Sequence, residues 1–149
     1  MNDARSDDGP IALPIDPRVA GSFAAQGLMA TLGARLVAAA DGVCAIEAPH
    51  GPHLAQQDGF FHAGATAAIA DTAAGYAAYT LMEPGARVLT VEFKIALMRP
   101  AAGDLLRAEA TVIRAGRSVT TVEATARVRR DGAWHDCARF LGTMMSVRG

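Results

Sequence analysis

A lone carboxylate lies in the middle of a long apolar stretch of this sequence. Residues 60–82, FFHAGATAAIADTAAGYAAYTLM, are almost all small or apolar, and Asp71 is the only acid among them. A buried Asp is rare and costly unless it has a partner. Asp71 therefore either bonds nearby backbone amides or an arginine from a strand, or is held reactive by its surroundings as a nucleophile or as a base for water.

The start of the same stretch offers a second chemical group. The sequence GFFHAGA predicts that a helix begins near His62, after Gly59. The first N–H groups of a helix have no partner within it, so the amides of Ala63 and Gly64 are candidates to stabilise an oxyanion. His62 either caps the helix or positions the loop as a satisfied core histidine, or takes a direct part in catalysis.

The spacing of these groups bears on the assembly. Ala63 and Asp71 are eight residues apart, which is about 12 Å along an α-helix. Catalytic groups must lie within about 3–3.5 Å of the reacting atoms. The two groups of one chain therefore cannot serve the same carbonyl carbon. If both take part, they come from different chains, and the spacing predicts an obligate homodimer with its site across a two-fold interface.

Periodicity and turn residues predict the elements that position these groups. A long helix over residues 62–80 is followed by a half-buried strand at 87–98. In that strand one face is polar (Thr90, Glu92, Lys94) and the other is apolar (Leu89, Val91, Phe93, Ile95, Leu97). Three more strands follow, at about 105–115, 117–129 and 133–147, the last two joined by an Asp131-Gly132 hairpin turn.

The N-terminal half begins with residues 1–15, which contain SDDGP and two further prolines and are predicted to form a flexible tail. A single domain over 16–149 follows. It starts with one short helix over 16–33, capped at or next to Asp16 and ended by Gly33. Two strands around Asp41-Gly42 and a loop over 49–59 lead to the long helix.

The long helix is apolar all round, so we expect it to be buried all round. Its Ala and Gly residues let a sheet approach closely, and the hairpin turns make the sheet antiparallel. The predicted class is therefore α+β, with an antiparallel sheet wrapped around a central helix.

Composition limits the classes of function. The net charge of −1 gives no reason to expect a nucleic-acid partner. Residues 60–82 are long enough to cross a bilayer, but Ala, Gly and the central Asp71 argue against a membrane span. Cys44 and Cys137 form no C-x-x-C pair, so metal and redox motifs are absent. With no secretory signal at the N-terminus, we expect a cytoplasmic protein.

These residues resemble a known family. FHAGATAAIADTAAGYAA, TVEFKIALMRPAAGD and the AGRS turn are similar to the hotdog-fold acyl-CoA thioesterases of the PaaI type, and the resemblance covers roughly residues 20–146. It implies a hotdog fold and hydrolysis of an acyl-CoA with no metal and no cofactor beyond the coenzyme A of the substrate. It also implies that Asp71 is the catalytic carboxylate and that the Ala63 amide, where the family usually has Gly, is the oxyanion donor.

Further roles follow from the resemblance alone. Gln56, or its neighbour Gln57, matches a side chain that helps to hold the carbonyl or the water, and Thr90 matches a residue that orients the water, although it is equally well an ordinary strand Thr. Segments that contact coenzyme A in the family match five residues here (Arg99, Arg114, Gly116, Arg117, Ser118). Arginine forks and turn amides suit phosphate oxygens. The alternative is that these arginines are merely solvated.

The sequence thus predicts hydrolysis of an aryl- or medium-chain acyl-CoA by a homodimer with shared active sites, which pairs into a dimer of dimers. One alternative is an acyl-CoA-binding protein of the same fold without activity, although binding does not require a buried carboxylate. The other is an enoyl-CoA hydratase or dehydratase, whose expected pattern is missing because Asp58 and His62 are separated only by GFF.

Overall fold

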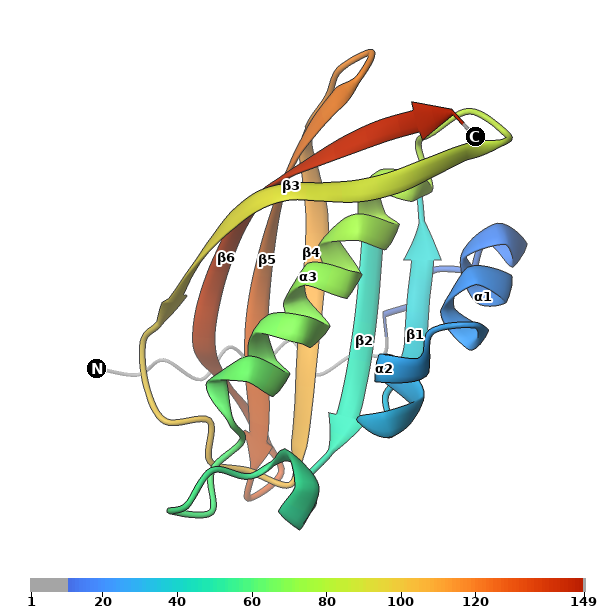
Figure 1. Ribbon diagram of the computed structural model, residues 1–149. Coiled ribbons are helices and arrows are strands. Elements are labelled where there is room, and N and C mark those ends of the chain that lie inside the picture. Colours follow the sequence, from blue (N-terminus) through green and yellow to red (C-terminus); the bar gives the residue numbers. More distant parts are fainter. Residues whose placement is uncertain (1–10, 149) are drawn as a thin grey trace.

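The computed structural model describes residues 11–148, which form one antiparallel sheet around a central helix (Figure 1). The elements in chain order are α1 (Pro17–Ala24), α2 (Gly27–Thr31), β1 (Arg35–Ala40), β2 (Val43–Pro49), a short 3₁₀ helix η1 (Pro52–Leu54), α3 (Ala63–Tyr79), β3 (Ala86–Leu97), β4 (Leu105–Ala115), β5 (Val119–Arg130) and β6 (Ala133–Arg148). The predicted fold class is confirmed.

The six strands lie in the order β1-β2-β4-β5-β6-β3, and every neighbouring pair is antiparallel. Two tight hairpins follow from Asp-Gly pairs, because Asp41 and Gly42, like Asp131 and Gly132, all have positive φ. A two-residue turn with positive φ at both positions matches the twist of the strands it joins. β3 and β1 are the two edge strands, at opposite ends of the sheet.

Helix α3 packs in the hollow of the sheet and contacts β1 to β6 (Figure 1). Five of its alanines have no exposed surface (Ala70, Ala73, Ala74, Ala77, Ala78). The prediction that α3 is buried all round is wrong, however, because one stripe of it stays open in this chain. Ala63 and Gly64 are exposed, and Asp71 and Thr72 are half-buried. The sequence of a helix that is apolar on all sides does not show whether each side is buried by the same chain or by a second chain.

The prediction that β3 is half-buried with one apolar face is also wrong. A bulge at Val91 shifts the register with β6, so Leu89 pairs with Met145 while Phe93 pairs with Gly142. A bulge reverses the faces that follow it. Thr90 therefore lies on the helix side, and so do Phe93, Ile95 and Leu97, whereas Glu92 and Lys94 lie on the outer side. Most side chains of β3 are exposed on both faces.

The N-terminal segment forms two helices instead of the single one expected over 16–33. The break falls at Ala25 and Gln26, where Gln26 is extended (φ −81°, ψ 108°) and precedes α2. Asp16 caps α1 as predicted, since its carboxylate accepts the Arg18 N–H at 2.8 Å. The Arg18 side chain donates to the Met82 carbonyl at 3.0 Å, which ties α1 to the end of α3.

Part of the predicted tail lies outside the described residues, namely 1–10. Within the described part, the Pro14 carbonyl accepts the Ala39 N–H at 3.1 Å and Ile15 pairs with Ala39 of β1. Regular contacts thus begin before Asp16. No helix within residues 11–148 has the length and apolarity that crossing a bilayer requires.

Candidate active site

Asp71 faces Thr90 across the space between α3 and β3. The Thr90 hydroxyl donates to Asp71 Oδ1 at 2.8 Å, and Asp71 is half-buried. Burial raises the pKa of Asp71 above its ordinary value, and the bond from Thr90 opposes this shift in part. Neither a backbone amide nor an arginine bonds the carboxylate within residues 11–148. Asp71 is therefore a poorly neutralised carboxylate with an open side, which suits a nucleophile or base.

The open side of Asp71 leads into a pocket of about 160 Å³ on one side of α3. Asp71 and Thr90 line it together with Gln26, Thr72, Gly75, Tyr76 and Val88. Because of the bulge at Val91, Thr90 lies on the same face of β3 as the apolar residues that follow the bulge, and this face points toward α3. Thr90 therefore reaches the pocket.

The start of α3 supplies the expected amide, but only one of the two candidates is available. His62 is the residue before α3, and its Nδ1 accepts the Gly64 N–H at 2.8 Å. The cap role for His62 is therefore confirmed, and the Gly64 amide is already engaged. Ala63 is the first residue of α3 and is exposed, so its N–H has no partner within the helix.

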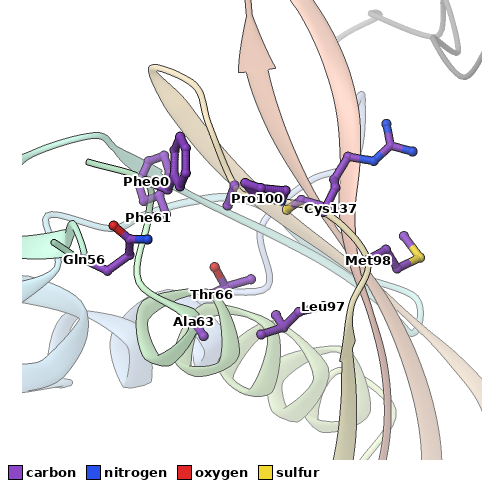
Figure 2. A pocket seen from close by; sticks show the side chains of 11 residues that line it. Gln56, Phe60, Phe61, Ala63, Thr66, Leu97, Met98, Pro100 and Cys137 are labelled. Atoms are coloured by element: carbon purple, nitrogen blue, oxygen red, sulfur yellow. The ribbon is translucent and has the colours of Figure 1, made fainter. Parts of the chain in front are cut away.

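Gln56 and Ala63 line a second pocket, of about 440 Å³, together with Phe60, Phe61, Thr66, Cys137 and the segment from Leu97 to Ala101 (Figure 2). Phe60, Phe61 and Gln56 stand over the start of α3, and Leu97 and Met98 lie at the end of β3 (Figure 2). The Gln56 side chain accepts the Asp58 N–H, which fixes the turn from Gln56 to Gly59. Gln57 bonds Asp58 at 3.2 Å and does not line the pocket.

The structure thus brings Gln56 to Ala63 and Thr90 to Asp71, but it places the two pairs in separate pockets. The two pairs are separated because Ala63 is the first residue of α3 and Asp71, eight residues later, lies near the middle of the helix. Within one chain, each pocket has two of the six predicted catalytic residues, and His62 and Gly64 line neither pocket.

The residues predicted to contact coenzyme A also separate. Arg99 lines the pocket at the start of α3, whereas Gly116, Arg117 and Ser118 line a larger one of about 1010 Å³ beside the end of α3. The backbone N–H of Arg99 donates to the Cys137 carbonyl of β6. The next residue of β6, Ala138, pairs with Ala126 of β5. From there to Val119 is seven residues of β5, or about 24 Å. Arg99 and Arg117 of one chain therefore cannot hold the same phosphate.

Two of these residues have a simpler explanation. Arg114 is exposed and lines none of the three pockets described above. A Cβ at Gly116 would lie 2.6 Å from the Val119 carbonyl oxygen, so the hairpin between β4 and β5 requires glycine there. Within residues 11–148, no three side chains of His, Cys, Asp or Glu gather where they could hold a metal ion.

Sequence reasoning missed Gln26 and Tyr76, which line the Asp71 pocket. Gln26 Nε2 donates to the Tyr76 hydroxyl at 2.7 Å across 50 positions of the chain. The available signal was weak: each is a polar side chain in an otherwise small or apolar segment.

The comparisons with known proteins agree with this architecture. The model of the thioesterase superfamily matches residues 58–134, just over half of the chain. The candidate esterase VNG_1336C of Halobacterium salinarum is 34% identical over 113 residues, which cover 72% of this chain and 74% of that one. A thioesterase family protein of Silicibacter pomeroyi is 43% identical in its crystal structure, covers 89% of this chain and 97% of its own, and has a TM-score of 0.87.

The fold extends to more distant proteins. The PaaI protein of the Escherichia coli phenylacetic acid degradation operon is 21% identical, with 87% of this chain and 91% of that one covered and a TM-score of 0.77. The family model, the identity to the relatives and the sheet around α3 together confirm the resemblance seen in the sequence. The chain belongs to the thioesterase superfamily and is a hotdog-fold thioester hydrolase.

Proposed function

We propose that this protein hydrolyses an acyl-CoA to the free acid and coenzyme A, at two sites shared between the subunits of a homodimer. The observation that carries the proposal is the Asp71–Thr90 pair, a half-buried carboxylate with a raised pKa that opens into a pocket. A carboxylate in this state is costly to the fold, and acyl transfer is a reaction that uses one. The residues that do the chemistry are Asp71, Gln56 and Ala63.

In the proposed reaction the thioester carbonyl oxygen accepts the Ala63 N–H at the start of α3 of one subunit, and Gln56 of that subunit assists. As charge develops on the oxygen, the N–H group and the helix dipole stabilise it. Asp71 of the other subunit either takes a proton from water, which attacks the carbonyl carbon, or attacks it directly. The C–S bond breaks and coenzyme A leaves as the thiolate, which is then protonated. In the second route, water hydrolyses the resulting anhydride.

The exposed edge of β3 supports the shared site. β3 is a 12-residue strand at the end of the sheet, and its long apolar side chains are exposed, including Leu89 at 56% and Val91 at 52%. An uncovered apolar edge strand is a template for pairing with another chain. A second copy paired there would also cover the open stripe of α3, and an antiparallel arrangement would bring Ala63 of one subunit toward Asp71 of the other.

The hairpin from Ala115 to Val119 belongs to this proposal as the contact for the coenzyme A phosphates. Arg117 and Ser118 line the largest of the three pockets, together with Arg148. Two cations and the turn amides suit phosphate oxygens. Arg99 remains a candidate for a different part of the coenzyme, because of its distance from Arg117.

Mixing two inactive variants tests the shared site directly. Asp71→Asn and Gln56→Leu subunits, co-expressed with two different tags, form heterodimers in which one site has both native residues and the other has neither. Random pairing then restores roughly a quarter of the wild-type sites. If Asp71 and Gln56 of the same chain work together, no heterodimer recovers turnover. Free coenzyme A, measured as thiol, is the readout, and ligand binding without thiol release by the wild type would instead favour a binding protein.

A further inference from the structure

The loop that carries Gln56 makes most of its hydrogen bonds within itself. The Gln56 N–H donates to the Phe60 carbonyl at 2.9 Å, and the Gly59 N–H donates to the Gln56 carbonyl at 3.0 Å. Gly59 has a φ of +84°, a left-handed conformation that glycine adopts without strain. Among residues 11–148, the tip of this loop, residues 57–59, forms one hydrogen bond to a partner outside 56–60, and that partner is His50.

His50 connects this loop to the sheet. It follows Pro49, the last residue of β2, and its N–H donates to the Asp104 carbonyl at 2.9 Å, just before β4 begins. Its Nε2 lies 2.9 Å from the Gly59 carbonyl oxygen, and because a carbonyl oxygen only accepts, Nε2 carries the hydrogen of this bond. Its ring also contacts Phe61 edge to face, with the ring centroids 5.0 Å apart. The loop is therefore held by a side chain whose own backbone is fixed to the sheet.

The conformation of the loop decides where the Gln56 amide points. Its Oε1 accepts the Asp58 N–H, so its NH₂ group is the part that is left for the pocket. Figure 2 shows the Gln56 nitrogen, rather than the oxygen, on the side of Thr66 and Ala63. One N–H of this group lies near Asp58 Oδ2, with the nitrogen at 3.4 Å, and the other stays available. Gln56 can therefore add a second donor, beside the Ala63 N–H, for the thioester oxygen.

We infer that His50 is a positioning residue for hydrolysis, which holds the Gln56 amide against the start of α3 through the carbonyl of Gly59; this inference rests on the proposed function. Donors to an oxyanion act most strongly when they are in place before the charge develops. A loop that moves away from α3 would leave the thioester oxygen with the Ala63 N–H alone. Since the bond from Gln56 strengthens as charge develops on the oxygen, its loss lowers kcat more than it raises KM.

Three substitutions of His50 separate the hydrogen bond from the ring contact. His50→Phe keeps an aromatic ring against Phe61 and removes the donor. His50→Gln keeps a donor, because its amide nitrogen reaches about as far from the backbone as the histidine Nε2, whereas His50→Asn is one methylene shorter and does not reach Gly59. We expect His50→Phe and His50→Asn to lower kcat for acyl-CoA hydrolysis, measured as thiol release, by about threefold to fivefold with little change in KM, the effect of one hydrogen bond. His50→Gln should stay within about twofold of the wild type.

His53→Phe is the matched control, because it makes the same substitution in the same loop. His53 is exposed in the short helix η1, its side chain makes no hydrogen bond within residues 11–148, and it lines none of the three pockets. His53→Phe should therefore keep the wild-type kcat. If His50→Phe does not fold, His50→Asn and His50→Gln carry the comparison.

The outcomes separate this inference from the proposed function. Wild-type kcat in both His50→Phe and His50→Asn would overturn the inference alone. An equal loss of kcat in all three His50 variants would also overturn it, because His50→Gln keeps the donor. Absence of thiol release by the wild type across a panel of aryl- and medium-chain acyl-CoAs would instead overturn the proposed function.

Discussion

Replacement of Asp71 by Asn separates the catalytic role of this side chain from its cost to the fold. The two side chains are nearly the same size. In the wild type the Thr90 hydroxyl donates a hydrogen bond to Asp71 Oδ1 at 2.8 Å, and an Asn oxygen can accept the same bond. The substitution removes the charge and replaces the second carboxylate oxygen by an NH₂ group. We therefore expect Asp71→Asn to lose thioester hydrolysis and, at neutral pH, to unfold at the same or a higher denaturant concentration than the wild type.

The two effects differ in size and in pH dependence. Loss of a general base lowers the rate by about 10²–10⁴-fold, which corresponds to about 3–5 kcal/mol in the activation free energy. Burial raises the pKa of Asp71, so its ionised form lowers the free energy of unfolding above that pKa. This penalty disappears as the pH falls through the folded-state pKa. The stability advantage of the Asn variant is therefore largest at neutral pH and closes in acid.

Thiol release from a fixed acyl-CoA and urea unfolding at neutral and acidic pH provide the two measurements. Asp71→Ala is the matched control, because it loses the charge and also leaves the Thr90 hydroxyl without its acceptor. It should be about 1 kcal/mol less stable than the Asn variant. Wild-type turnover by Asp71→Asn would refute the catalytic role. A stability advantage of Asp71→Asn over the wild type that is smaller at neutral pH than in acid would refute the reasoning on burial.

Three other substitutions test neighbouring contacts. Thr90→Val should lower kcat/KM about tenfold and move the acidic limb of its pH profile to higher pH, because the bond from Thr90 lowers the pKa of Asp71. Thr90→Ser should restore both values, and an acidic limb that does not move in Thr90→Val would contradict an effect of Thr90 on Asp71. Arg117→Gln should raise KM for an acyl-CoA about threefold to tenfold and leave KM for an acyl-pantetheine unchanged, whereas equal effects on both would exclude a phosphate contact. Arg18→Met should lower the free energy of unfolding by about 1 kcal/mol in urea titrations, since the bond to the Met82 carbonyl is lost, and unchanged stability would show that this tie is unimportant.

Local signals were sufficient for most of the fold. The Asp-Gly pairs at 41–42 and 131–132 require a two-residue hairpin, and the small residues of 63–79 form a helix that a sheet can approach closely. The spacing of Ala63 and Asp71 also predicted that they would not meet in one chain, and they lie in different pockets. Each of these features depends on residues close together in the sequence.

The features that sequence reasoning missed depend on distant contacts. The alternation through residues 89–95 is unbroken, so nothing in it indicates the bulge at Val91, which forms only against β6. The break between α1 and α2 lies where Gln26 bonds Tyr76, fifty positions away. Both errors concern the same pocket, because the bulge directs Thr90 into it and the break brings Gln26 to it.

The small residues of α3 serve the site as well as the packing. Ala74 and Ala78 have no exposed surface, and the helix contacts β2, β3, β4, β5 and β6. A larger side chain at such a position would overpack the core and force α3 away from the sheet. The bond between Asp71 and Thr90 joins α3 to β3 at 2.8 Å, and lengthening by about 1 Å would break it. The close approach that alanine permits therefore fixes the carboxylate against its hydrogen-bond donor, and the same composition that made Asp71 conspicuous in the sequence holds it in position.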